Sequence, residues 1–222
     1  MIQNLALFDL DNTLLAGDSD YNWSLFLIGE GLLDEKTHYD RNEQFYQDYN
    51  NGCLDIFKFL KFQLQPLSQH PKAFLDKLHL KYMETVIRPM MTNKAQALVN
   101  QHKANGDLCM IITATNSFVT KPIATAYGIA HLIGTDPEVV DGQFTGNVSG
   151  EPSFQAGKVS RLTAWLAERE QQLDSFKTSY FYSDSHNDLP LMKLVTNPVA
   201  VDADETLSAY AKAQGWPSIS LR

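Results

Sequence analysis

The sequence contains little cysteine, and what it has is too sparse to organise a fold. Cys53 and Cys109 are the only two in 222 residues, with no CxxC spacing and no companion histidine cluster. This pattern excludes a disulfide framework and a zinc site, and it favours a reducing compartment. Because Cys109 lies inside the apolar run before Thr113, we interpret it as a buried packing residue and not as a reactive thiol.

The chain also lacks a surplus of basic residues. It has 18 Lys and Arg against 26 Asp and Glu, which gives a formal net charge of -8. Sequence-independent binding to nucleic acid relies on clustered Lys and Arg, whereas the basic residues here are scattered, so we expect no nucleic-acid partner. A small phosphorylated metabolite remains compatible with an acidic chain, because a metal ion and one or two local cations can reverse the field inside a pocket.

Long hydrophobic runs are absent too. No run could span a bilayer, and the N-terminus reaches its first apolar run without a basic region or a cleavage site. We therefore expect a soluble, cytoplasmic protein without a membrane partner. A length of 222 residues suffices for one α/β domain plus a smaller module. A monomer and a homodimer both stay open.

Three short apolar runs end in reactive polar residues. The runs are 5–8, 109–112 and 180–182, and the polar residues that follow them lie at 9–13, at 113 and at 183–188. A short, unbroken apolar run is typical of a strand buried on both faces. Ligands of open α/β sheets bind just beyond the carboxyl ends of the strands. The pattern therefore predicts one shared site at one edge of a parallel sheet.

Residues 18 to about 86 predict helices, with no sheet strand among them. Aromatic and aliphatic residues recur there at spacings of three and four, as in Trp23, Phe26 and Leu27. Turns are expected at Gly29 to Gly31, at 50–52, and around Pro66 and Pro71. We interpret residues 18–87 as a small α-helical cap domain inserted into a core formed by residues 1–17 and 88–222.

From Pro89 onward, helix and strand alternate. Helices are expected at 92–105, to Tyr127, at 155–170, from about 189, and at 205–213, and strands ending at 113 and 184, near 132–133 and at 199–201. Asp141-Gly142 is typical of a tight hairpin. This βαβ alternation predicts an α/β fold with a doubly wound, mostly parallel, Rossmann-like sheet.

The acidic residues at the strand ends indicate a magnesium site. Asp9 and Asp11 lie two apart, so at the end of an extended strand they would point to the same side, where two carboxylates repel unless a cation or a proton separates them. Asp184 and Asp188 add hard oxygen ligands, and an all-carboxylate set suits Mg²⁺ better than zinc. Any one of these residues by itself is as readily a helix N-cap or a turn former.

The order of these motifs resembles the haloacid dehalogenase-like hydrolase superfamily, and specifically its phosphoserine phosphatase-like branch. The motifs are DLDNT at 9–13, Thr113 after an apolar strand, Lys158 near a helix start and DSHND at 184–188. The resemblance covers nearly the whole chain, and the helical insert looks like the cap of that branch. The four-part combination is highly specific, whereas DxDxT alone is only suggestive.

The resemblance implies a Mg²⁺-dependent phosphatase, which is a phosphoric monoester hydrolase. Asp9 would be the nucleophile that forms an aspartyl-phosphate, and Asp11 the general acid and base. Thr113 and Lys158 would bind the phosphoryl oxygens. The Asp9 carboxylate, the Asp11 backbone carbonyl and Asp184 would hold Mg²⁺, with support from Asp188. Thr13 would steady the loop after the nucleophile.

The resemblance leaves the substrate open between two small phosphorylated metabolites. Asp18 has the spacing of the acidic residue that binds the amine of phosphoserine, and Asn187 belongs to the last motif as a further substrate contact. Leu54 stands where counting places the arginine that binds the carboxylate, and the clearest substitute in the insert is Arg41. A phosphorylated amino alcohol such as histidinol phosphate would need the anionic Asp18, with Asp20 as a further candidate, and no arginine. Asp18 could equally cap a helix, and Arg41 could be a surface residue.

A different class of protein also combines strand-end acids, a hydroxyl, a lysine and Mg²⁺, namely the receiver-type phosphoacceptor domain of signalling proteins. Its first strand carries an adjacent acidic pair, whereas this chain has DxDxT. It also lacks an insert of about 70 residues between its first two strands. The sequence therefore favours the hydrolase.

Overall fold

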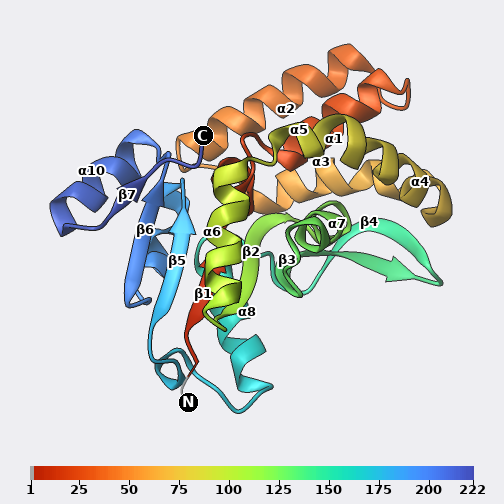
Figure 1. The fold of residues 1–222 in the computed structure, drawn as a ribbon. Helices are drawn as coiled ribbons and strands as arrows, with labels where there is room; N and C mark the ends of the chain where they lie inside the picture. The colour runs from red at the N-terminus through yellow and green to blue at the C-terminus, as the bar shows by residue number, and fades with distance from the viewer. Residues whose placement is uncertain (1–2) are drawn as a thin grey trace.

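Residues 3–222 are described by a computed structural model, and within them seven strands form one sheet (Figure 1). The order across the sheet is β4-β3-β2-β1-β5-β6-β7, and only the β3–β4 pair is antiparallel. The strands are β1 (Leu5–Phe8), β2 (Leu108–Asn116), β3 (His131–Val140), β4 (Gln143–Ser149), β5 (Ser179–Ser183), β6 (Asn197–Val201) and β7 (Ser218–Ile219). The predicted doubly wound, mostly parallel sheet is confirmed. Residues 1 and 2 of the predicted core lie outside the described part.

Both faces of the sheet are buried, which explains why its central strands read as continuous apolar runs. In β1, Ala6 and Phe8 face one apolar cluster, Leu5 and Leu7 face another, and all four are fully buried. The first cluster includes residues of α6 (Asn93–Ala104) and α7 (Ser117–Tyr127). The second includes residues of α8 (Ala156–Ala167), α9 (Leu189–Met192) and α10 (Glu205–Gln214). Cys109 is buried and free, as its prediction as a packing residue requires.

The register of the central strands brings the polar strand ends together. Phe8 of β1 pairs with Ile111 of β2 on one side and with Tyr182 of β5 on the other. The N–H of Asp9 continues the ladder by donating to the carbonyl of Tyr182 at 2.9 Å. The residues that follow the three strands therefore lie at one edge of the sheet, as the sequence predicted.

Two expectations about strands were wrong in detail. Thr113 does not end β2, because the strand continues to Asn116, with a shift in register against β3 between Ile112 and Asn116. β3 also extends far beyond the short strand expected near 132–133, because pairing with β4 prolongs it to Val140. Sequence patterns of burial miss both extensions, since these strand ends carry polar or exposed residues.

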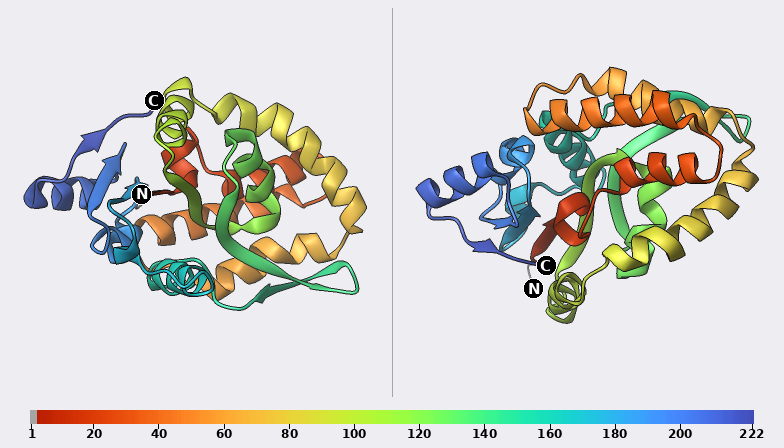
Figure 2. Two further views of the ribbon diagram at one scale, coloured as in Figure 1. Left: turned by 60° about the horizontal axis from the view of Figure 1, so that its bottom comes forward. Right: turned by 90° about the horizontal axis from the view of Figure 1, so that it is seen from above.

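The segment between β1 and β2 is helical, as expected. Its helices are α1 (Ser19–Gly29), α2 (Glu35–Asn50), α3 (Ile56–Ser68), α4 (Lys72–Tyr82) and the short α5 (Arg88–Met90). Figure 1 shows α1 to α4 at the end of the sheet where the arrowheads of β5 and β6 point, and Figure 2 (right) looks down on them from above. Asp18, Asp34 and Asp55 cap the first three helices by accepting backbone N–H bonds.

Pro66 was expected at a turn but lies inside α3, where it is buried, so packing overrides its local preference. None of the helices in the described part of the chain is long and apolar enough to cross a membrane.

The predicted Asp141-Gly142 hairpin is confirmed. Both residues have positive φ, at 50° and 77°, which is the geometry of a tight hairpin turn, and Val140 pairs with Gln143 across it. β4 packs closely on α3: a Cβ placed on Gly146 would lie 3.3 Å from the Cα of Gln65 and 3.2 Å from the Oγ of Ser68. The hairpin therefore braces the helical segment against the sheet.

We predict that Gly146→Ala destabilises the protein more than Gly142→Ala does. The two glycines have nearly equal φ, 78° and 77°, so each variant loses about 1 to 2 kcal/mol through backbone strain. Only Gly146 has α3 against it, so its variant loses a further ~1 kcal/mol or more from overpacking. Urea unfolding of both variants measures the difference, and equal losses would show that β4 does not brace α3.

Candidate active site

The chain turns sharply after β1, and this turn separates the two acids of the DxDxT motif. Residues Leu10–Leu14 form one wide turn in which Asn12 has a φ of 54°, and the N–H of Leu15 donates to the carbonyl of Leu10. Asp9 remains extended at the end of the strand and is only 5% exposed. The side chains of Asp9 and Asp11 consequently have different partners, whereas an extended strand would have pointed them to the same side.

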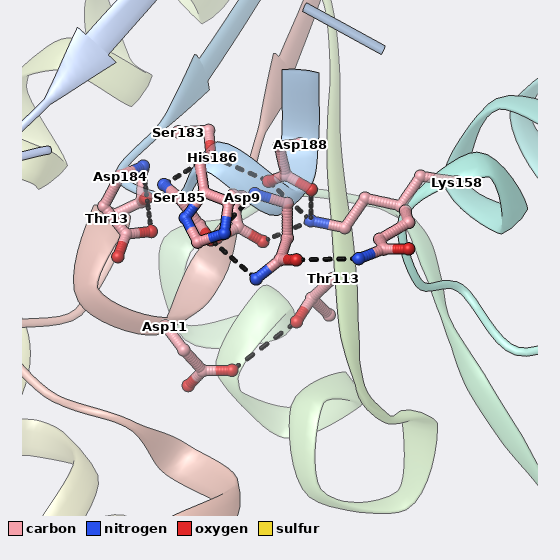
Figure 3. A network of polar contacts seen from close by, with 12 residues as sticks. Asp9, Asp11, Thr13, Thr113, Lys158, Ser183, Asp184, Ser185, His186 and Asp188 are labelled. Atoms are coloured by element: carbon pink, nitrogen blue, oxygen red, sulfur yellow. Dashed lines mark hydrogen bonds and ion pairs between the residues drawn. The ribbon is translucent and has the colours of Figure 1, made fainter. Parts of the chain in front are cut away.

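Lys158 links the first and last motifs through a buried ion pair. Its Nζ lies 2.8 Å from Oδ1 of Asp9 and 2.8 Å from the carboxylate of Asp188, to which Ser183 also donates at 2.7 Å (Figure 3). Burial favours the neutral amine, but the charges of Asp188 and Asp9 outweigh it and raise the pKa of Lys158. Burial raises the pKa of Asp9 to about 7, against the opposing effect of Lys158.

Asp184 is held by Thr13 from the turn after β1. The Oγ1 of Thr13 donates to Oδ1 of Asp184 at 2.9 Å and accepts from the Asp184 N–H at 3.0 Å, and Thr13 is fully buried. Burial, followed by the charge of Asp9, raises the pKa of Asp184 well above its usual range. The last residue of the DxDxT motif thus orients the acid at the end of β5.

Asp11 is surrounded by hydrogen-bond donors. Its Oδ1 accepts from the N–H of Ser19 and its Oδ2 from the Oγ1 of Thr115 at 2.7 Å, with the Oγ1 of Thr113 more distant at 3.5 Å. Burial and then the charge of Asp18 raise the pKa of Asp11 to about 6. A carboxyl group with a pKa near neutrality can both give and take a proton, which is what a general acid and base must do.

A pocket opens beside Asp9, Asp11 and Lys158. Its walls contain six aromatic rings. Two of its acids come from the end of β1 and the turn after it, and two from the start of α1. The rings belong to Tyr21, Phe45, Tyr46, Tyr49, Phe59 and Phe154, and the acids are Asp9, Asp11, Asp18 and Asp20. Lys158 is the one basic residue among the described residues that line the pocket, so the pocket can recognise a positively charged group better than a second negative one.

The other predicted substrate residues have these positions. Asp18 lines the pocket, but its Oδ1 caps α1 by accepting from the N–H groups of Asp20 and Tyr21. Asn187 accepts from Gln155 at 2.8 Å and donates to the carbonyl of Tyr49 at 3.1 Å. Arg41 is exposed, is not part of the pocket lining, and places its guanidinium over the rings of Phe45 and Phe62.

The sequence analysis missed Thr115, which makes the shorter of the two threonine contacts to Asp11. The predicted strand ended at Thr113, two residues before Thr115. Thr113 and Thr115 lie two apart in β2, so the period of a strand puts both on one side, and that alternation was the available signal. Sequence spacing offers no comparable signal for Ser183, because its role depends on where Asp188 turns back towards β5.

The donor set fits a magnesium ion. The negative charges of Asp9, Asp184 and Asp188 repel one another. Lys158 offsets part of this repulsion by pairing with Asp9 and Asp188. In residues 3–222, no three acidic, histidine or cysteine side chains form a group that could hold a metal by themselves. Mg²⁺ commonly takes only one or two carboxylates and completes its shell with other oxygens and water. Asp9 and Asp184, whose charges act on each other, supply such a pair of carboxylates.

Comparison with known proteins decides the family. The model of the haloacid dehalogenase-like hydrolases matches residues 6–193. This chain belongs to that family. It is 46% identical, over the full length of both chains, to a histidinol-phosphatase of Neisseria meningitidis serogroup C, and 24% identical to a phosphoserine phosphatase of Streptococcus thermophilus, over 96% of this chain and 90% of that one.

Solved structures agree with the family assignment. A protein of unknown function from Bordetella pertussis Tohama I has a TM-score of 0.95 and 47% identity, with both chains fully covered. A substrate-bound phosphoserine phosphatase has a TM-score of 0.70 and 17% identity, covering 100% of this chain and 94% of that one, which shows a shared fold. The prediction of a phosphoric monoester hydrolase of this superfamily is confirmed, and family membership argues against the receiver-domain alternative.

We predict that Lys158→Met destabilises the metal-free protein by about 3 to 5 kcal/mol, because it leaves buried carboxylates without a counter-charge. In the variant, the pKa of Asp9 rises further above its unfolded value near 3.9, so the folded state holds its proton at higher pH than the unfolded state does. The deficit should therefore be largest above neutral pH and shrink as the pH falls towards about 5.

Urea unfolding in EDTA at several pH values measures this deficit. Lys212→Met, at an exposed lysine of α10, is the matched control and should change stability by less than about 0.5 kcal/mol. A deficit that does not depend on pH would mean that Lys158 stabilises the fold by packing alone.

Proposed function

We propose that this enzyme is a Mg²⁺-dependent phosphatase that hydrolyses a phosphorylated amino alcohol of the histidinol phosphate type through an aspartyl-phosphate on Asp9. One observation carries the proposal: the pocket above Asp9 has aromatic walls and acidic residues, and Lys158 is the one basic residue among its described lining residues. Such a pocket complements a phosphate ester whose remaining groups are positively charged or aromatic.

In the first step, a carboxylate oxygen of Asp9 attacks phosphorus and the bond from phosphorus to the ester oxygen breaks. Lys158 donates to Oδ1 of Asp9 and so holds the carboxylate in place for the attack. Asp11 gives its proton to the departing ester oxygen, so the product leaves as a neutral alcohol. The raised pKa of Asp11, about 6, keeps a useful fraction of it protonated near neutral pH.

In the second step, Asp11 is a carboxylate and takes a proton from a water molecule that attacks phosphorus. The bond between phosphorus and Asp9 breaks, phosphate leaves, and both acids return to their starting forms. The N–H of Ser19 and the hydroxyl of Thr115 keep the Asp11 carboxylate in place for both proton transfers.

The phosphoryl group itself needs positive charge and hydrogen-bond donors around its oxygens. Lys158 and Thr113 line the pocket next to Asp9 and are proposed to bind these oxygens, while Asn187 fixes the adjoining loop against α2. A magnesium ion held by Asp9, the Asp11 carbonyl and Asp184, with Asp188 beside them, would offset the charge of the phosphoryl group and the nucleophile.

The pocket favours histidinol phosphate over phosphoserine. The carboxylate of phosphoserine requires a basic partner, yet Lys158 is already paired with two acids and Arg41 stacks on Phe45 outside the pocket lining. Histidinol phosphate has an ammonium and an imidazole instead, which suit the acids and the aromatic rings of the pocket. The relative named histidinol-phosphatase, at 46% identity, supports the same choice.

We also propose that residues 18–87 act as a cap over a core of residues 1–17 and 88–222. The helical segment contributes most of the aromatic wall, including Tyr21, Phe45 and Phe59, whereas the core contributes Asp9 and Lys158. A cytoplasmic location fits the exposed free thiol of Cys53, which a reducing compartment would preserve.

We predict that Asp9→Asn lowers kcat by about 10⁴-fold or more, the scale expected when a nucleophile is removed, while the circular dichroism spectrum stays unchanged. The matched control is Asp174→Asn, the same change at an exposed acid outside the pocket lining, which should keep wild-type turnover. Near-normal turnover of the Asp9 variant would remove Asp9 from the nucleophile role.

We further predict that, with Mg²⁺ present, kcat/KM for histidinol phosphate exceeds that for phosphoserine by about 100-fold or more, because a second negative charge in an acidic pocket costs several kcal/mol. EDTA should abolish turnover of both and excess Mg²⁺ should restore it. Phosphate release from a panel of monoesters measures these rates. A preference for phosphoserine, or turnover that survives EDTA, would refute the substrate or the metal requirement respectively.

A further inference from the structure

Asp20 is a buried acid in the pocket with one oxygen left unpaired. It is the second residue of α1, it is 4% exposed, and it lines the pocket. Asn116, at the end of β2, donates to its Oδ1 at 3.2 Å. Its Oδ2 is buried and has no hydrogen-bond partner among residues 3–222. A buried carboxylate oxygen without a donor is costly, so this atom calls for an explanation.

The fold does not need a carboxylate at this position. The cap of α1 is already provided by Asp18, which accepts the N–H groups of Asp20 and Tyr21 at 2.9 and 2.8 Å. The bond from Asn116 could be accepted equally well by the amide oxygen of an asparagine at position 20. The second oxygen of Asp20 is therefore not needed to cap α1 or to bind Asn116, although the charge of Asp20 lies favourably in the first turn of α1.

No described residue of the pocket supplies a cation for Asp20. Lys158 is occupied by Asp9 and Asp188, and the nearest charges to Asp20 are those of Asp18 and Asp11. Burial, followed by these two charges, raises the pKa of Asp20 well above its usual range. A positively charged group that entered the pocket would relieve this repulsion and pair with the free oxygen.

The neighbouring charges also indicate where that cation would lie. Asp20 interacts electrostatically with Asp11, the acid proposed to protonate the ester oxygen. Because Asp20 and Asp11 line the same pocket, a group bound by Asp20 can belong to the same small ester, as the ammonium of a 2-aminoalkyl phosphate does. The aromatic walls, with Tyr21 next to Asp20 in the chain, add the ring faces that favour an ammonium.

We propose that the carboxylate of Asp20 accepts a hydrogen bond directly from the ammonium group of a 2-aminoalkyl phosphate substrate and so determines specificity, while Asp18 mainly caps α1. This inference rests on the proposed phosphatase function and goes beyond it, because the motif spacing indicated Asp18. Asp20 is a specificity residue here and takes no part in phosphoryl transfer.

The test compares two esters that differ only in the ammonium group, O-phosphoethanolamine and propyl phosphate, with Mg²⁺ present. For the wild-type enzyme we expect kcat/KM to favour O-phosphoethanolamine by about 10- to 100-fold, the value of one hydrogen bond to a charged group. In Asp20→Asn the preference should fall below about threefold, through a higher KM for O-phosphoethanolamine, with kcat for propyl phosphate largely kept.

Asp18→Asn is the matched variant, because asparagine caps a helix as well as aspartate does. It removes the same charge two residues away and should keep most of the preference. A preference that survives Asp20→Asn, one that only Asp18→Asn erases, or a wild-type ratio near one would each overturn the proposal. If Asp20→Asn failed to fold by circular dichroism, Asp20→Ser would remove the same carboxylate with a smaller polar side chain.

The outcomes separate this inference from the proposed function. If the wild-type enzyme hydrolyses histidinol phosphate but Asp20→Asn leaves the ester preference intact, the function stands and the role of Asp20 is refuted. If it ignores histidinol phosphate yet prefers O-phosphoethanolamine in an Asp20-dependent manner, the role of Asp20 stands and the proposed substrate is refuted.

Discussion

The ion pair of Lys158 with Asp9 and Asp188 is the interaction on which the rest of the site depends. Six acids lie near one another beyond the sheet, at positions 9, 11, 18, 20, 184 and 188. All are buried or partly buried, so water screens their charges poorly. One buried lysine between two of them makes the arrangement tolerable and leaves a deficit of positive charge. That deficit is what a magnesium ion and a cationic substrate would fill. Burial, together with the neighbouring acids, raises the pKa values of Asp9, Asp11 and Asp184.

The sheet and the helix α8 bring these residues together. β1 lies between β2 and β5, so three chain segments far apart in sequence end side by side, and α8 brings Lys158 to the same edge. The turn after β1 then separates Asp9 from Asp11. As a result the proposed nucleophile, Asp9, pairs with Lys158, while the proposed general acid, Asp11, accepts bonds from hydroxyl and amide donors that keep it fixed.

The residues that line the pocket come from two parts of the chain, the edge of the sheet and the helices between β1 and β2. The edge of the sheet holds the groups proposed for phosphoryl transfer, and the helices between β1 and β2 hold most of the aromatic rings together with Asp18 and Asp20. In the proposed function, reaction type and substrate choice are thus encoded in different segments. This division explains how relatives named for histidinol phosphate and for phosphoserine can share one fold.

Sequence alone determined the fold class, the helical segment, the Asp-Gly hairpin and the residues that meet at the sheet edge, because each follows from local patterns: apolar runs, helical periodicity, and strand ends. Tertiary structure decided what depends on partners distant in the chain. Thr115 faces Asp11 because β2 continues beyond Thr113, Arg41 lies on Phe45 outside the pocket, and Asp20 keeps a free oxygen where Asp18 is bound to its own helix. Side-chain direction and burial are set by packing between segments, and no spacing along one segment encodes them.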